Sequence, residues 1–138
     1  LQAEAKEDLI ILDDEDLHQQ SYKNQIIKPK WLDYKSKYRM LTFQLKADHR
    51  RLYREKWEYY GGKATNKIYI AKPFDIKVLK TDLGVYISSD DDIIDIELKI
   101  EYYETLVQFI EGVIKSIDNR SWDIKHAQDW KKFLAGSF

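Results

Sequence analysis

The residues of this chain best suited to chemistry are cations interleaved with aromatic rings between residues 21 and 80. Sixteen of the chain's 23 Lys and Arg residues lie there against five Asp and Glu, a net charge of +11, whereas residues 1–20 and 81–138 each carry −6. The same segment holds 11 of the 19 aromatic residues. Lys and Arg neutralise phosphates and aromatic rings stack on bases, so this pattern is typical of proteins that bind single-stranded nucleic acid. A solvated helix whose aromatic residues form the core is the alternative.

Other kinds of chemistry find little support in the sequence. The absence of Cys excludes a disulfide scaffold, a thiolate metal site and a Cys nucleophile. His18, His49 and His126 are scattered, without the spacing of metal ligands. The segment 61–65 lacks the upstream glycine of a P-loop, and its Lys63 is followed by Ala. We therefore expect no enzymatic activity, no metal and no cofactor.

The composition predicts one helical domain. Of the 138 residues, 34% are charged and only seven are Pro or Gly, which favours long helices with much solvated surface. No apolar stretch approaches the length of a membrane span and no signal peptide is recognisable, so we expect no membrane partner and a reducing, cytoplasmic setting. Because the chain begins with Leu1, we expect the natural start to lie upstream.

A long helix is predicted to carry the cations. Proline suits a first helical turn and glycine a helix end, so residues from Pro29 to Gly61 and Gly62 predict a helix of about 31 residues. Its apolar seam comprises Trp31, Tyr34, Tyr38, Leu41, Leu45, Leu52 and Tyr59. A different side carries Lys35, Arg39, Lys46, Arg50 and Arg54. Since a short chain cannot cover so long a helix, we expect it to need a partner.

The segments on either side of this helix differ in character. Residues 1–12 predict a short acidic helix, and Asp13–Asp16 precede a second short helix that ends before Pro29. Residues 63–89 alternate apolar and polar side chains around Phe74 to Val78. They predict one or two strands, or an extended arm, near 68–87.

The C-terminal segment has the most regular apolar periodicity. Residues 91–118 predict a helix capped by Asp90–Asp92, and a final helix is predicted from a Ser121 cap to about Leu134. Their apolar seams are wide enough to contact more than one neighbour, so we predict that they mediate self-assembly. The residues assigned to this role are Ile96, Ile100, Tyr103, Val107, Ile110, Ile114, Ile117, Trp122, His126, Trp130 and Phe133.

Three segments resemble a known family. Pro-Lys-Trp-Leu at 29–32, Arg-Glu-Lys-Trp-Glu-Tyr-Tyr-Gly-Gly at 54–62 and Ile-Lys-His-Ala-Gln-Asp-Trp-Lys-Lys-Phe-Leu-Ala-Gly at 124–136 are similar, in the same order, to UvsY-type recombination mediators of T-even-like phages. The resemblance implies a non-enzymatic protein of the infected host's cytoplasm that binds single-stranded DNA. It implies a RecA-type recombinase and a single-strand binding protein as partners. It also implies a hexamer- or heptamer-like ring that needs the C-terminal helices for assembly.

The resemblance also indicates a DNA-binding site. The family's DNA-contacting Lys-x-Arg before a Tyr-Tyr pair corresponds to Arg54 and Lys56, with the order of the cations swapped. With the neighbouring cations and tyrosines, the predicted site comprises Lys46, Arg50, Arg51, Arg54, Lys56, Tyr59, Tyr60, Lys63 and Lys67.

The predicted architecture is mainly α and forms a single domain, residues 1–138, that assembles as a ring-like homo-oligomer. It consists of acidic N-terminal helices (1–28), a basic long helix (29–60), an extended or β segment (63–89) and oligomerisation helices (91–135). A helical oligomeric adaptor that binds no DNA stays open as the alternative, and the salt dependence of binding to oligo(dT) distinguishes the two.

Overall fold

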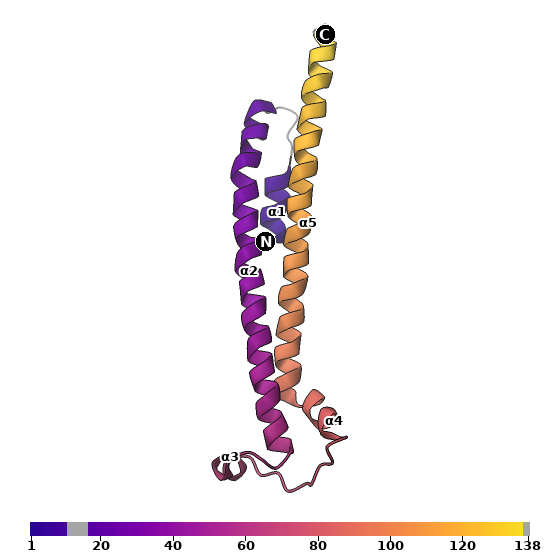
Figure 1. Cartoon of the computed structure of the whole chain (residues 1–138). Helices are drawn as coiled ribbons and strands as arrows, with labels where there is room; N and C mark the ends of the chain where they lie inside the picture. The colour runs from indigo at the N-terminus through magenta and orange to yellow at the C-terminus, as the bar shows by residue number, and fades with distance from the viewer. Residues whose placement is uncertain (11–16, 137–138) are drawn as a thin grey trace. The chain divides into compact units, whose positions relative to one another are not determined.

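A computed structural model describes residues 1–10 and 17–136. These residues contain no strand, and the predicted mainly α class is confirmed (Figure 1). The helices are α1 (Gln2–Leu9), α2 (Leu17–Tyr60), α3 (Asn66–Ala71), α4 (Leu83–Ser88) and α5 (Asp91–Leu134). They form two compact units, unit 1 (Leu1–Tyr38 with Leu106–Phe138) and unit 2 (Arg39–Thr105). The predicted helix start at Asp13–Asp16 lies outside the described residues.

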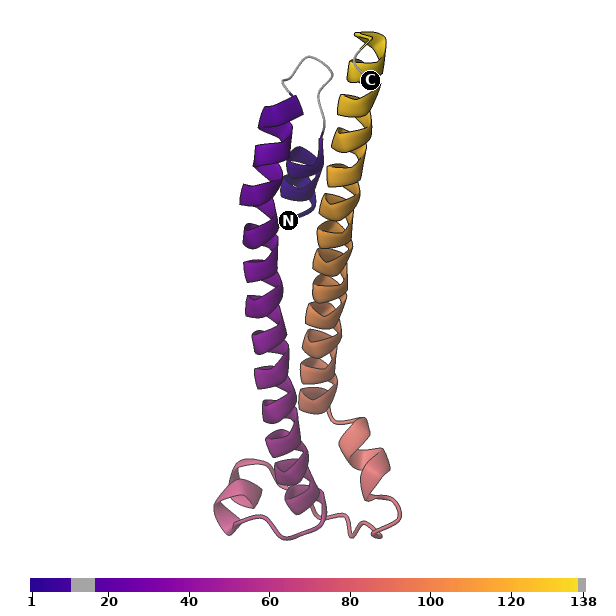
Figure 2. The same cartoon turned by 45° about the horizontal axis from the view of Figure 1, so that its top comes forward.

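Unit 1 is a three-helix core in which α1 lies against both α2 and α5 (Figures 1 and 2). Trp31 of α2 and Ile110 and Ile117 of α5 are fully buried in this core. Ala5 from α1, Ile27 from α2 and Val113 from α5 complete it. Full burial of a side chain as large as Ile stabilises the folded state by about 1.5–3 kcal/mol. The first part of the apolar seam of α2 is therefore covered by the chain's own helices, and an outside partner for the long helix stays a prediction.

Polar groups fix α1 on α2. The indole Nε1 of Trp31 donates a hydrogen bond of 2.9 Å to Oδ2 of Asp8. The Lys30 ammonium lies 2.6 Å from the same carboxylate and 2.9 Å from that of Glu4. Burial acts to raise the pKa of Asp8, but its hydrogen bonds with Lys30 and Trp31 outweigh it and hold that pKa below its usual value. The acidic helix is thus held by charge and hydrogen bonding as well as by apolar contact.

The start of α2 differs from the sequence prediction. The helix begins at Leu17 and contains Pro29, which was predicted to begin it. A proline inside a helix lacks the N–H that would bond to the carbonyl four residues earlier, at a cost of about 3 kcal/mol. Ile27 and Trp31, on either side of Pro29, are both buried in the core of unit 1. Their burial offsets the cost of the proline, and the two predicted helices are one.

The predicted boundary at Ser121 is also wrong, because α5 runs through it. The Ser121 hydroxyl donates to the Ile117 carbonyl at 3.3 Å, one turn back in the same helix, and accepts from Nδ2 of Asn24 at 2.8 Å. The neighbouring Arg120 is buried and donates to the Gln20 carbonyl at 2.9 Å. These contacts with α2 keep the helix continuous where the local sequence offers a cap.

Unit 2 is built around the fully buried Ile87 and Ile93. Leu83 lies in the same cluster, and Leu52 of α2 packs against it. Leu83 and Ile87 are four residues apart, which places both on one side of the short helix α4. The strand predicted near 68–87 is therefore wrong at its C-terminal end, where Leu83–Ser88 are helical.

Around Phe74 the strand alternative is also wrong, since residues 73–79 have no regular secondary structure, and the extended arm remains. The Phe74 ring lies 5.1 Å from that of Tyr60 and 6.1 Å from that of Tyr86. These ring contacts hold the segment, whereas an alternating pattern would require the cross-strand pairs of a β-sheet.

The predicted end of α2 at the glycine pair is confirmed. The helix ends at Tyr60, and Gly62 has a φ of 75°, the left-handed conformation that glycine adopts without strain. The Lys63 N–H bonds to the Glu58 carbonyl at 2.8 Å, which closes the last turn in the manner of a Schellman motif. A Cβ on Gly61 would lie 2.8 Å from the Trp57 carbonyl oxygen. Both glycines are needed for the chain to leave α2 in this direction.

Candidate nucleic-acid interface

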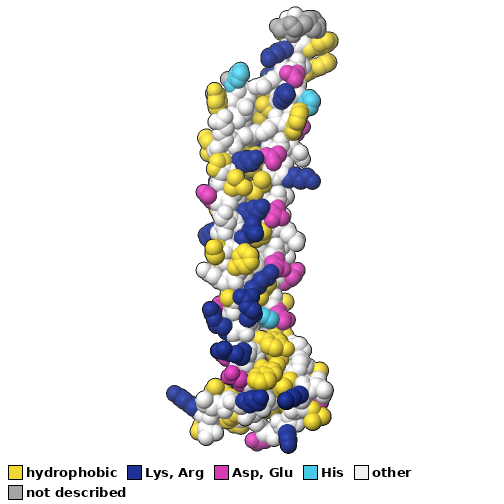
Figure 3. All heavy atoms as spheres, in the orientation of Figure 1, with side chains coloured by type: hydrophobic (Ala, Val, Ile, Leu, Met, Phe, Trp, Pro, Cys, Tyr) yellow, Lys and Arg dark blue, Asp and Glu magenta, His cyan; other side chains and the backbone are white. Residues whose placement is uncertain are grey.

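The outer face of α2 in unit 2 alternates exposed cations with exposed aromatic rings. Phe43, Tyr53 and Trp57 are 59%, 41% and 37% exposed. Spacings of three, four and seven residues keep them on one face of the helix with three exposed arginines. We call this face the basic-aromatic stripe: Arg39, Phe43, Arg50, Tyr53, Arg54 and Trp57. Figure 3 shows Lys and Arg side chains gathered over α2 in the lower half of the view, with hydrophobic side chains between them.

The three arginines of the stripe keep their charge available. None of them forms an ion pair with any described residue. Two other predicted cations are paired: Lys46 lies 2.7 Å from Glu104, and Arg51 lies 3.1 Å from Asp48. Both pairs are solvent-exposed, where ion pairs contribute about 0–1 kcal/mol, so a phosphate can compete with them.

Lys56 occupies a different environment. Its ammonium group lies 2.8 Å from Asp92 and 3.4 Å from Asp90, at the start of α5. Burial acts to lower the pKa of Lys56, and the hydrogen bond and charge of these carboxylates raise it above the ordinary value. The structure thus separates the two cations of the family motif, with Arg54 on the stripe and Lys56 turned to α5.

Tyr59 and Tyr60 belong to a cluster of five rings that holds the connector between α2 and α5. The Tyr59 ring stacks on Tyr69 at 5.5 Å, and its hydroxyl donates to the Lys72 carbonyl at 3.0 Å. The Tyr60 hydroxyl donates to Asp90 at 2.6 Å, and burial together with this carboxylate raises the pKa of Tyr60. Both side chains are half-buried. Neither lies on the stripe, where the Phe43 ring is open to solvent.

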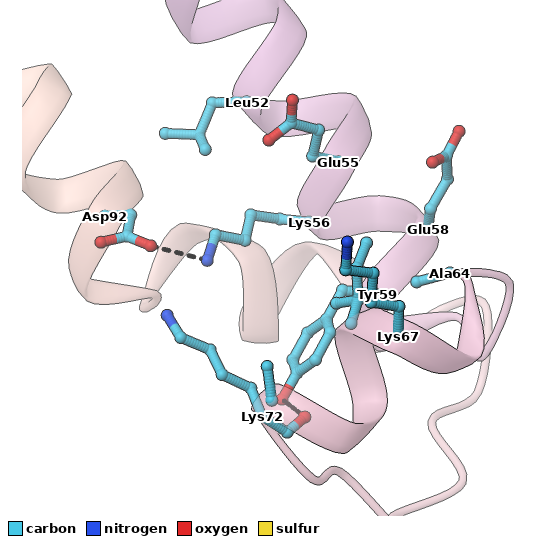
Figure 4. Close-up of a pocket in the computed structure, with 11 residues that line it drawn as sticks. Leu52, Glu55, Lys56, Glu58, Tyr59, Ala64, Lys67, Lys72 and Asp92 are labelled. Atoms are coloured by element: carbon cyan, nitrogen blue, oxygen red, sulfur yellow. Dashed lines mark hydrogen bonds and ion pairs between the residues drawn. The ribbon is translucent and has the colours of Figure 1, made fainter.

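The last two predicted cations lie beyond the end of α2. The Lys63 ammonium lies 4.5 Å from the centre of the Trp57 ring, a cation–π contact at the end of the stripe. Lys67 is exposed and lines a cavity of about 610 Å3 between α2, α3 and the start of α5 (Figure 4). The complete lining is Leu52, Glu55, Lys56, Glu58, Tyr59, Ala64, Lys67, Ile68, Ala71, Lys72 and Asp92.

The predicted oligomerisation residues divide into two groups. Ile110 and Ile117 are fully buried within unit 1, and five others are half-buried: Ile96, Ile100, Tyr103, Val107 and Ile114. The C-terminal members face solvent, since Trp122, Trp130 and Phe133 are all more than half exposed. His126 is exposed too and stacks on Trp122 at 5.9 Å. Among the predicted oligomerisation residues, the exposed ones therefore lie at the end of α5.

The sequence prediction of the interface omitted the three exposed rings of the stripe. Phe43, Tyr53 and Trp57 were counted as aromatic residues without being assigned to a face. The available signal was their spacing from the arginines, because Phe43 precedes Arg50 by seven residues and Trp57 follows it by seven. Seven residues are almost two helical turns, so Phe43, Arg50 and Trp57 lie on one side of the helix.

Two further kinds of site were sought in the described part of the chain. It contains no group of three or more His, Asp or Glu side chains placed to hold a metal ion. Among its helices, none combines the length and the apolar character required to cross a bilayer.

These features define an all-helical protein with a basic-aromatic face at one end of a long helix. The family model for the recombination, repair and ssDNA binding protein UvsY matches residues 4–137, so the chain belongs to the UvsY family. The resemblance noted in the sequence is thereby confirmed.

Individual relatives agree with the family match. The chain is 26% identical to recombination protein uvsY of Enterobacteria phage T4 over 136 residues, which cover 99% of the chain and 96% of the relative. It is also similar to crystal structures of the bacteriophage T4 recombination mediator protein UvsY. For lattice type II the TM-score is 0.84 at 25% identity, over 97% of this chain and 94% of that one. For lattice type I the TM-score is 0.84 at 25% identity, over 96% and 97%.

Proposed function

We propose that this protein is a non-enzymatic recombination mediator that binds single-stranded DNA along the basic-aromatic stripe of α2. The observation that carries the proposal is the alternation of exposed, unpaired arginines with exposed rings on one helical face of a UvsY-family chain. Arginines bind phosphates through several N–H groups, and rings stack on bases of any sequence. Together these two interactions bind a single strand without sequence preference.

The mediator role follows from this binding and from the family. The protein would hold a single strand that a single-strand binding protein covers and help a RecA-type recombinase to assemble on it. In the host cytoplasm, the strand passes from the single-strand binding protein to the stripe one segment at a time, because each contact with the stripe is individually modest. The test is recombinase filament assembly on DNA coated with single-strand binding protein, which the mediator should accelerate.

Self-assembly into a hexamer- or heptamer-like ring would strengthen the binding. Trp122, Trp130 and Phe133 form an exposed apolar face on the last turns of α5, and monomeric proteins rarely leave large contiguous apolar patches in water. Several stripes in one assembly act on a single strand by avidity, which exceeds the affinity of each stripe without any new contact.

Fluorescence anisotropy of labelled oligo(dT) as a function of salt tests the DNA-binding proposal. Each phosphate contact contributes about 0.7 to the slope of log affinity against log salt. We expect Arg50→Ala with Arg54→Ala to make the slope shallower by about 1.4 per engaged subunit. The matched control is Lys99→Ala with Lys115→Ala, which removes two exposed cations of α5. Absence of any binding by the unmodified protein would instead support the helical adaptor.

A further inference from the structure

The cavity between α2, α3 and the start of α5 has the composition of a small-molecule site. Its volume of about 610 Å3 falls within the range of about 300–1,000 Å3 typical of ligand pockets. The apolar part of its wall comes from Leu52, Tyr59 and Ile68, with Ala64 and Ala71 beside them. Figure 4 labels Leu52, Tyr59 and Ala64 among the lining residues, together with the three lysines Lys56, Lys67 and Lys72.

We propose that this cavity accepts one unstacked nucleobase of the bound strand, with the adjoining phosphate at Lys67 and Lys72. The inference rests on the proposed function, since it assumes that the strand lies on the stripe. A base needs an apolar and aromatic surface for its faces, and its backbone needs cations at the mouth. The cavity supplies both.

The lining has three Lys side chains and three carboxylates, so a phosphate at the mouth depends on the position of the lysines and not on a net charge. Lys56 is already paired with Asp92 at 2.8 Å, so these two groups neutralise each other inside unit 2. Lys67 and Lys72 form no ion pair with the described residues. The carboxylates of Glu55 and Glu58 also line the cavity, where they can accept hydrogen bonds from the amino groups of a base.

The aromatic wall is held in position before any ligand arrives. The Tyr59 ring stacks on Tyr69, and the Tyr59 hydroxyl donates to the Lys72 carbonyl at 3.0 Å. Tyr69 in turn donates to the Tyr59 carbonyl at 2.7 Å. A fixed ring loses little conformational freedom on binding, which favours its use as a recognition surface.

The position of the cavity suits a strand that leaves the stripe. Trp57 is the last ring of the stripe, and the lining residues Glu58 and Tyr59 follow it directly in α2. Lys63 lies over Trp57 and extends the cationic path past the helix end. Four lining residues of α2, Leu52, Glu55, Lys56 and Tyr59, lie on the side of the helix opposite the stripe. A backbone that follows the arginines therefore reaches the cavity mouth by turning round the end of α2, past Lys63.

Filling the cavity tests the inference. Ala71→Trp adds a large side chain to the lining, and Ile70→Trp adds the same side chain at an exposed position of α3 that does not line the cavity. Binding is measured for an oligonucleotide and for an abasic oligomer of the same length. We expect Ala71→Trp to reduce the preference for the oligomer with bases by about tenfold, the contribution of one stacked base. Affinity for the abasic oligomer should be equal in all three proteins.

The outcomes separate this inference from the proposed function. An equal preference for bases in Ala71→Trp and Ile70→Trp would overturn the cavity site and leave binding to the stripe intact. Failure of the unmodified protein to bind either oligomer would overturn the proposed function itself. If Ala71→Trp kept full DNA binding and lost binding to the recombinase, the cavity would hold a protein segment and the inference would be wrong.

A second variant covers the case in which Ala71→Trp does not fold. Ile68→Ser removes part of the apolar wall without adding bulk, and Ile68 is already partly exposed. We expect Ile68→Ser, like Ala71→Trp, to reduce the preference for the oligonucleotide over the abasic oligomer. An unchanged preference in a folded Ile68→Ser protein, verified by circular dichroism, would also overturn the inference.

Discussion

The ammonium group of Lys56 lies 2.8 Å from the carboxylate of Asp92 and joins the end of α2 to the first turn of α5. Asp90, 3.4 Å away, completes the contact and also accepts the N–H of Asp92 at 2.9 Å as a helix cap. The side chains of Lys56 and Asp90 are only 14% and 10% exposed. This pair explains why one cation of the predicted DNA-binding motif, Lys56, is turned towards the protein.

Lys56→Met should therefore act on stability and not on phosphate binding. Loss of the cation leaves the half-buried Asp90 without a charge partner, which should lower the free energy of unfolding by about 1–3 kcal/mol. The slope of DNA affinity against salt should be unchanged. Urea unfolding and anisotropy check the two effects. Arg54→Ala is the matched variant, with the reverse expectation of near-normal stability and a shallower slope. A shallower slope in folded Lys56→Met would place Lys56 on the DNA.

The rings of the stripe should contribute affinity that salt does not remove. Phe43→Leu with Trp57→Leu keeps apolar character and deletes two stacking surfaces, each of which contributes about 1–3 kcal/mol per base. We expect weaker binding to oligo(dT) with an unchanged salt slope, measured by anisotropy. Tyr22→Leu, an exposed ring of unit 1, is the control. Equal affinity of the double variant and the control would exclude stacking on the stripe.

The carboxylate of Asp8 should make unit 1 sensitive to acid. Its pKa is lowered in the folded state, so its contribution is fully present above the unfolded value of about 3.9 and is lost as the pH falls through the folded pKa. Asp8→Asn keeps an oxygen for the Trp31 N–H but does not titrate. We expect its thermal stability to be lower at pH 7 and to fall less than that of the unmodified protein as the pH is lowered below about 3.9. Parallel curves would contradict the assignment.

Two glycines should respond to alanine in opposite directions. Gly62→Ala places a Cβ on a residue with φ of 75°, which should destabilise the protein by about 1 kcal/mol. Gly112 lies inside α5, and a Cβ there would meet nothing within 4 Å. Gly112→Ala should stabilise the protein by about 0.5–1 kcal/mol through helix propensity. Thermal melts of both variants check this, and destabilisation by Gly112→Ala would indicate a close contact with another copy.

Assembly should depend on the exposed end of α5. Trp130→Gln with Phe133→Gln changes side chains that are outside the core of unit 1, so the fold should persist while the assembly becomes smaller. Analytical ultracentrifugation measures the size and circular dichroism the fold. Deletion of residues 120–138 is a poorer test, because it removes Arg120 and Ile124, both buried in the chain itself. An assembly of unchanged size in the double variant would exclude this surface from assembly.

Local sequence signals were reliable where nothing distant competed with them. The Asp90 cap and the glycine pair after Tyr60 were placed correctly, since each depends on hydrogen bonds within a few residues. The signals failed at Pro29 and Ser121, where each residue offers a helix boundary that the chain does not use. At both positions, contacts with a helix far away in the sequence outweigh about 1–3 kcal/mol of local preference.

The candidate site divides in the same way. The concentration of cations and rings, and the helix that carries them, follow from residue types and spacing alone. Which rings are open was decided by tertiary structure, because Tyr59 and Tyr60 pack into the ring cluster while Phe43 and Trp57 stay exposed. The orientation of Lys56 was also decided by tertiary structure, because its ammonium group pairs with Asp90 and Asp92, 34 and 36 residues further along the chain. Spacing along one helix determines which residues share a face, and only packing between helices determines which face stays in water.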